Sequence, residues 1–207
     1  MRIALLAVAA LLAFGVSSAA GAAPAFTGTI EPVRWADLRF SYRAGCPVGS
    51  MQLRTISVSH WGFDGKPHAG RLVIARQHAP AILGVFRKLW AVKFPLRRLR
   101  PVSAYRGSDD ASMAADNSSG FNCRIVGGTS RWSLHAYGEA IDVNPIENPY
   151  VRGSNVSPPA GRAYLDRGRY RKGMAVRGGV LVRAFASVGW KWGASFGDYQ
   201  HFSTTGR

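Results

Sequence analysis

The chain has 207 residues and a formal net charge of +16, because 27 lysines and arginines outnumber 11 aspartates and glutamates. It contains no internal repeat, coiled coil or low-complexity tract, and no second long apolar segment follows the N-terminal one. These features exclude repeat architectures and stable membrane insertion. They predict a soluble protein of single-domain size.

The first residues have the pattern of a secretory signal peptide. Arg2 precedes an uncharged apolar run from Ile3 to Val16, and small residues ending in Ala-Gly-Ala follow. The run is shorter than the roughly 20 residues of a membrane-spanning helix, and no basic stop-transfer cluster follows it. We therefore predict a signal peptide at 1–22 and a single exported, monomeric domain at 23–207.

Export affects the interpretation of the cysteines and of the charge. Cys46 and Cys123 would be free thiols in the cytosol, whereas an oxidising compartment favours one long-range disulfide between them. The positive charge then points away from nucleic acid and toward anionic cell-wall polymers or lipid headgroups. A basic surface that only aids solubility is the competing interpretation.

The first half of the chain predicts a β-hairpin followed by a helix. A strand containing Leu53 to Val58, turn residues in "FDGKPHAG" and a β-branched strand in "RLVIA" form the hairpin. In residues 78–95, apolar side chains repeat at helical spacing and Pro95 ends the pattern.

The second half predicts shorter elements. Residues 101–130 are polar and are interpreted as a long loop, in which 104–105 and 121–126 are candidate short strands. Residues 140–143 predict a core strand, residues 176–188 predict a second helix, and aromatic strand pieces follow. The combination predicts an α+β fold, with a small antiparallel sheet and helices packed on one side.

Two pairs of histidine and aspartate stand out among the polar residues. His135 lies seven residues before Asp142, and Asp198 lies three residues before His201. Zinc in a hydrolytic site takes three protein ligands and leaves a fourth position for water. Three of these four side chains could hold the metal, and a carboxylate three residues from a ligand histidine could be the general base. The spacing alone fits hydrogen-bonded structural pairs as well.

Two motifs in this region resemble a known family. "SLHAYGEAID" has the pattern Ser-x-His-x-x-Gly-x-Ala-x-Asp, and "WGASFGDYQHF" has the Trp-Gly and carboxylate-x-x-His-Phe ending, of the zinc D-alanyl-D-alanine carboxypeptidase and L-alanyl-D-glutamate peptidase superfamily. The resemblance is to its secreted bacterial branch and runs from about Cys46 to Phe202. It implies that the small antiparallel sheet carries the zinc ligands.

The resemblance also implies a role for each residue of the two motifs. His135, Asp142 and His201 would bind Zn²⁺, and Asp198 would be the general base. Many relatives have glutamate at the base position, so the shorter aspartate is a departure. Glu139 competes for the role of base, but in a strand its side chain should face outward, away from that of Ala140.

Members of the family use an arginine to hold the substrate and to stabilise the oxyanion, and two arginines are candidates here. "AYRGS" nominates Arg106 because it resembles a Gly-Tyr-Arg-Ser sequence in relatives. "GFNCR" nominates Arg124, which lies near the first motif and next to Cys123. Ser133 is expected to hydrogen-bond to the substrate or to a ligand side chain. The sequence leaves the choice between the two arginines open.

The leading hypothesis is a secreted or cell-wall-associated zinc peptidase. It would cleave a bond involving a D-amino acid in peptidoglycan stem peptides, as a carboxypeptidase or an endopeptidase. Stem peptides and anionic wall polymers would be its partners, and nucleic acid would not. The rival hypothesis is a noncatalytic wall-binding module that keeps the metal for structure or for gripping a peptide terminus.

Overall fold

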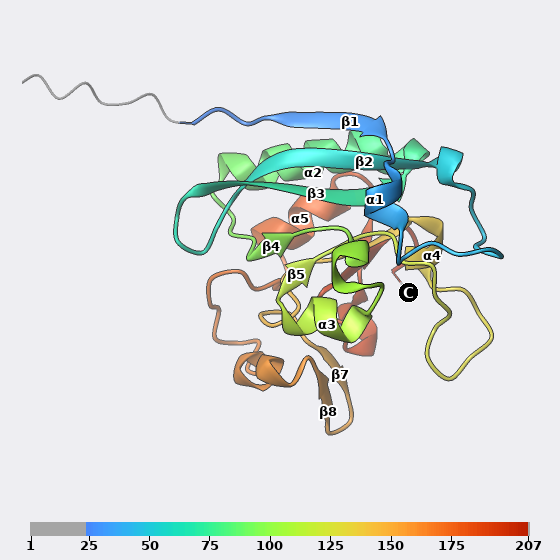
Figure 1. Cartoon of the computed structure of the whole chain (residues 1–207). Coiled ribbons are helices and arrows are strands. Elements are labelled where there is room, and N and C mark those ends of the chain that lie inside the picture. Colours follow the sequence, from blue (N-terminus) through green and yellow to red (C-terminus); the bar gives the residue numbers. More distant parts are fainter. Residues whose placement is uncertain (1–23, 207) are drawn as a thin grey trace, which may run out of the picture.

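The computed structural model describes residues 24–206, so the signal peptide predicted at 1–22 lies outside the described residues. Residues 24–206 contain two three-stranded antiparallel sheets together with short and medium helices (Figure 1). The predicted α+β class is confirmed. Within 24–206, no helix combines the length and the apolar character that a membrane span requires.

The first sheet has the strand order β1-β2-β3, with β1 at Gly28–Pro32, β2 at Leu53–Trp61 and β3 at Pro67–Ala75. β2 and β3 confirm the predicted hairpin, although the ladder continues through residues that we assigned to the turn. β1 was not predicted, and neither was the short helix α1 (Trp35–Leu38) that follows it. β1 is a mostly exposed edge strand, so its sequence lacks the apolar alternation that identifies a half-buried strand.

Both faces of this sheet are covered. On one face, Ile56 and Leu72 pack against the buried side of α2 (Ala79–Ala91), which confirms the helix predicted in 78–95. On the other face, Leu53 and Val73 pack against Leu38 and Phe121. Each fully buried side chain of this kind contributes about 1.5–3 kcal/mol.

The second sheet has the order β6-β10-β9, with β6 at Ala140–Asp142, β9 at Lys191–Trp192 and β10 at His201–Ser203. β6 confirms the core strand predicted in 140–143. Helix α5 (Val180–Ala186) lies within the predicted helix 176–188 and buries Phe185, whose ring stacks on Phe202 with centroids 4.3 Å apart. The two sheets, α2 and α5 share one hydrophobic core.

Short elements connect these parts. They are η1 (Ser50–Gln52), η2 (Arg76–His78), β4 (Arg98–Leu99), η3 (Val102–Tyr105), α3 (Asp109–Ala114), β5 (Asn117–Ser118), α4 (Leu134–Tyr137), β7 (Tyr150–Arg152), β8 (Asn155–Ser157), η4 (Pro159–Tyr164) and η5 (Gly193–Phe196). β4 pairs with β5 in parallel, and β7 and β8 form an antiparallel hairpin.

Two strands that we predicted in the loop 101–130 are absent. Residues 104–105 belong to the 3₁₀ helix η3. In 121–126, the backbone N–H groups of Phe121, Asn122 and Cys123 donate to three different segments, namely to the carbonyls of Val73, His135 and Ser41. Further along, residues 124–126 make only an isolated antiparallel bridge, with Ile125 opposite Trp132, so no regular ladder forms.

The predicted disulfide between Cys46 and Cys123 is present, with the two Cα atoms 5.8 Å apart. It joins the segment after α1 to the segment 121–124. Since the amide of Asn122 donates to the carbonyl of His135, the disulfide also supports the backbone around the first motif.

Candidate metal centre

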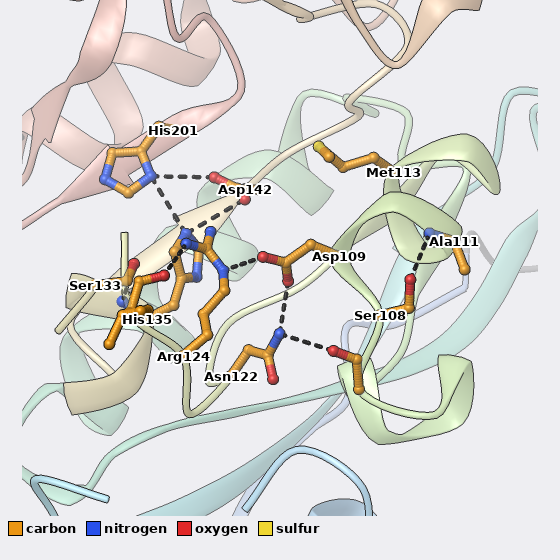
Figure 2. Close-up of polar contacts among 12 residues, drawn as sticks. Ser108, Asp109, Ala111, Met113, Asn122, Arg124, Ser133, His135, Asp142 and His201 are labelled. Carbon is orange, nitrogen blue, oxygen red and sulfur yellow. Dashed lines mark hydrogen bonds and ion pairs between the residues drawn. The ribbon is translucent and has the colours of Figure 1, made fainter. Parts of the chain in front are cut away.

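Three side chains from distant parts of the sequence converge at the edge of the second sheet (Figure 2). His201 and Asp142 are direct partners across β10 and β6, and the distance from His201 Nδ1 to Asp142 Oδ1 is 3.1 Å. His135, on α4, places its Nε2 3.3 Å from Asp142 Oδ2 and 3.3 Å from His201 Nδ1. The structure therefore brings together the three residues that the sequence nominated as metal ligands.

The geometry of this cluster fits a tetrahedral zinc ion. Zinc–nitrogen bonds of about 2.0–2.1 Å put neighbouring ligand atoms about 3.3 Å apart. His135 Nδ1 lies 2.7 Å from the carbonyl oxygen of Gly120, which can only accept a hydrogen bond. Nδ1 therefore donates a proton to this carbonyl, which leaves Nε2 as the ring nitrogen that can bind a metal. The two imidazoles and the carboxylate are a donor set that can hold Zn²⁺.

The local fold around Gly138 places His135 in the cluster. Ser133 is the N-cap of α4, and its hydroxyl oxygen accepts a hydrogen bond from the His135 amide. Gly138 ends the helix with a φ of 68°, and its carbonyl accepts a hydrogen bond from the amide of Ala75 at the end of β3. Only a residue without a Cβ fits here, since a Cβ would lie 2.5 Å from the Ala75 nitrogen.

Burial and charge set opposite protonation preferences for the two aspartates of the site. Burial opposes ionisation of Asp142, but the charges and hydrogen bonds of His135 and His201 outweigh it and hold the pKa of Asp142 well below its usual range. Burial and the negative charge of Asp142 together raise the pKa of Asp198 to about 7, against a weaker opposing effect of the two histidines. The two carboxyl groups therefore differ in their tendency to ionise.

Asp198 is positioned for a role that differs from that of the three cluster residues. It follows η5, where its amide donates to the carbonyl of Gly193, and its carbonyl accepts from the His201 amide. Its Oδ1 is buried and accepts no hydrogen bond from the described residues. It is not among the side chains whose ligand atoms form the His135, Asp142 and His201 cluster.

The side chain of Glu139 faces away from the cluster. Its carboxylate accepts hydrogen bonds from Gln77 Nε2 at 3.4 Å and Thr204 Oγ1 at 3.3 Å, and it lies 3.9 Å from His78 Nε2. These contacts leave Asp198 as the better-placed candidate for a general base.

The structure distinguishes the two candidate arginines. The carbonyl of Arg124 accepts a hydrogen bond from the amide of Ser133, two residues before His135, and its guanidinium pairs with Asp109 (Figure 2). Arg106 caps η3 with a φ of 55°, and its guanidinium lies over the ring of Phe40, 5.3 Å from the centroid. Arg124 is therefore bonded through its backbone to the segment that carries His135, whereas the contact of Arg106 is with the segment after α1.

Two residues that the sequence analysis missed hold Arg124 in place. Asp109 forms an ion pair with Arg124 and accepts a 2.6 Å hydrogen bond from Asn122 Nδ2. A usable signal was present, because Ser108 followed by two aspartates is a typical helix start, and Ser108 does cap α3. The carbonyl of Gly120, which orients His135, has no signal in the sequence.

Comparison with known proteins supports this interpretation of the C-terminal part of the chain. Residues 127–204 match the family model described as D-alanyl-D-alanine carboxypeptidase. This segment contains both motifs, so the resemblance to the zinc D-alanyl-D-alanine carboxypeptidase superfamily is confirmed there and supports a peptidase. The first sheet and α2 lie outside the match. Neither the curated proteins nor the solved structures gave a match.

Replacing Gly138 by alanine should disturb the metal centre and destabilise the fold. The new Cβ would meet Ala75 N at 2.5 Å and Ile74 C at 3.1 Å, and the positive φ would also be strained. We expect Gly138→Ala to lower the free energy of unfolding by about 2 kcal/mol or more and to weaken zinc affinity. Urea denaturation and zinc titration measure the two effects.

Gly65→Ala is the matched control. Gly65 has a φ of 73°, but a Cβ there would meet nothing within 4 Å. This variant should show only the cost of backbone strain and should bind zinc normally. Equal loss of stability in the two variants, or unchanged zinc affinity in Gly138→Ala, would show that the close approach of Gly138 to β3 does not position His135.

Proposed function

We propose that the protein is an exported zinc peptidase that hydrolyses a bond involving a D-amino acid in the stem peptides of peptidoglycan. The observation that carries this proposal is the buried, unpartnered carboxylate oxygen of Asp198 beside the cluster of His135, Asp142 and His201. Three residues can hold the metal, and a fourth is available for proton transfer. The family match and the disulfide support an extracytoplasmic peptidase.

The residues around the cluster have distinct tasks in this proposal. A bound Zn²⁺ would polarise the scissile carbonyl and lower the pKa of a coordinated water. Asp142 is ionised and balances part of the charge of the cation. Because the cation would offset the charge of Asp142, it would also favour the ionised form of Asp198. Asp198 then accepts a proton from the attacking water and delivers it to the leaving amine.

Arg124 is the proposed substrate-binding and oxyanion-stabilising group. Its guanidinium is held by an ion pair with Asp109, which does not involve the metal ligands, and its backbone is bonded to Ser133 of the first motif. A fixed positive charge at this place complements the negative charge that develops on the carbonyl oxygen. Ser133 is a second candidate, because its cap uses an oxygen lone pair and leaves the O–H available to donate.

The site favours catalysis over a purely structural use of the metal. A structural zinc site is closed by four protein ligands. Within residues 24–206, the side chains placed to hold a metal ion are those of His135, Asp142 and His201, and Asp198 is not among them. A zinc ion held by these three residues would therefore keep a fourth position for water or substrate.

Variants of His135 and Asp198 should separate metal binding from proton transfer. His135→Ala should lose both zinc and hydrolysis, because it removes a ligand. Asp198→Asn should keep zinc and lose roughly 10²–10⁴-fold in kcat, the usual contribution of a general base. Mass spectrometry of stem-peptide fragments measures hydrolysis, and elemental analysis measures zinc.

Glu139→Gln is the control for Asp198→Asn, since it neutralises a carboxylate within the first motif that faces Gln77 and Thr204. It should retain activity. Substantial hydrolysis by Asp198→Asn, or loss of activity in Glu139→Gln with zinc retained, would contradict the assigned base.

Substitution of the two arginines tests the assignment of the oxyanion-stabilising group. Arg124→Ala should keep zinc and lower kcat/KM by roughly 10²–10³-fold, because a charge that acts in the transition state is removed. Arg106→Ala should stay near the wild-type value. The reverse order of effects on the rate of stem-peptide cleavage would assign the role to Arg106.

A further inference from the structure

A cavity of about 410 Å³ lies between the end of α2 and the segment that leads into α5. Its lining includes three cations, Lys93, Lys172 and Arg183, and the apolar side chains of Phe94, Met174 and Val180. It shares no residue with the metal centre. In Figure 1 the orange segment that leads into α5 runs along the side of the molecule opposite α4.

No carboxylate in the described part of the chain neutralises these three cations through an ion pair. Lys172 Nζ donates to the carbonyl of Phe63 at 3.0 Å, and Arg183 donates to the carbonyl of Gly178. Lys93 Nζ lies over the ring of Trp61, 5.1 Å from the centroid. All three residues are exposed, so their positive charges are available to an incoming anion.

The walls of this cavity come from two stretches of the chain that lack acidic residues. Residues 65–108 contain ten lysines and arginines and no acidic residue, and residues 167–197 contain seven and again no acidic residue. One wall of the cavity comes from each stretch. Three of these 17 cations, Lys93, Lys172 and Arg183, line the cavity, and neither stretch supplies an acidic residue to its walls.

Buried asparagines hold the two walls together. Asn144 Nδ2 donates to the carbonyl of Pro95 at 2.9 Å and to that of Gly173 at 3.1 Å. Asn148 Nδ2 donates to the same Gly173 carbonyl at 3.0 Å, and both asparagines are fully buried. Because the walls are fixed before a ligand arrives, binding need not order them.

We propose that this cavity binds an anionic polymer in which charged groups alternate with sugar or polyol units. Several unneutralised cations suit repeating negative groups, whether phosphodiesters or carboxylates. The apolar floor and Tyr170, which lines the cavity and is 59% exposed, offer a face for the organic unit between charges. The assignment of this polymer to a bacterial wall rests on the proposed function. The prediction that the cavity binds such a polymer does not depend on that function.

Calorimetry of the full mature, zinc-loaded protein with two probes tests this site. Poly(glycerol phosphate) supplies phosphodiesters and polygalacturonate supplies carboxylates on sugar rings. Lys172→Gln with Arg183→Gln should weaken binding about tenfold and reduce its dependence on salt. Lys172→Gln alone should weaken binding about threefold. This single variant keeps the hydrogen bond of Arg183, so loss of that hydrogen bond cannot explain its weaker binding.

Lys66→Gln with Arg100→Gln is the matched control. It removes the same charge from two exposed residues of an acid-free stretch, outside the cavity. It should change affinity less than twofold, and both double variants should cleave a short soluble stem peptide at the wild-type rate. Equal weakening in the two double variants, or no binding of either probe, would overturn the site whether or not the protein is a peptidase.

Tyr170→Ala tests the organic part of the ligand. It should weaken binding of polygalacturonate several-fold and leave binding of inorganic polyphosphate unchanged. Polyphosphate that binds as tightly as both organic polymers, with no effect of Tyr170→Ala on any of them, would overturn the assignment to a polymer with sugar or polyol units.

Discussion

The antiparallel pairing of β6 with β10 is the interaction on which the site depends. In this register His201 lies opposite Asp142, and the next pair along the ladder is Phe202 opposite Ile141. Phe202 and Ile141 are fully buried in the shared core, so their packing fixes the register. A slip of one residue would exchange the core side chains with the polar ones. Hydrophobic packing thereby sets the relative position of two candidate metal ligands, Asp142 and His201, that are 59 residues apart in the sequence.

The first sheet supplies the remaining part of the site through its last residues. The hydrogen bond between the Ala75 amide and the Gly138 carbonyl ties α4 to β3, and the Gly120 carbonyl orients the ring of His135. Two buried histidines and a carboxylate that face one another at 3.1–3.3 Å would be costly without a cation to compensate them. The β6–β10 pairing, the Ala75–Gly138 hydrogen bond and the hydrogen bond from His135 to the Gly120 carbonyl together fix these side chains. A metal ion would therefore meet ligands that are already in position.

Sequence patterns predicted the elements with a strong apolar signal. Apolar and β-branched residues around a turn indicated β2 and β3, and the helical period in α2 and α5 reflects burial of one face of each helix. β1 was missed because it is mostly exposed, and 121–126 was misassigned because its backbone bonds to three separate segments. The motifs predicted the metal cluster. The pairing of Asp109 with Arg124 and the basic cavity depend on how distant segments approach one another, which spacing along the chain does not encode.

Anomalous diffraction at the zinc edge from crystals of the zinc-loaded protein shows whether these side chains hold a metal ion. We expect one zinc ion bound by His135 Nε2, His201 Nδ1 and a carboxylate oxygen of Asp142, at about 2.0–2.2 Å. The fourth ligand should be a water, with Asp198 beside it and not bound to the metal. A zinc ion bound by Asp198 as a fourth protein ligand, or one located away from these residues, would rule out the proposed site.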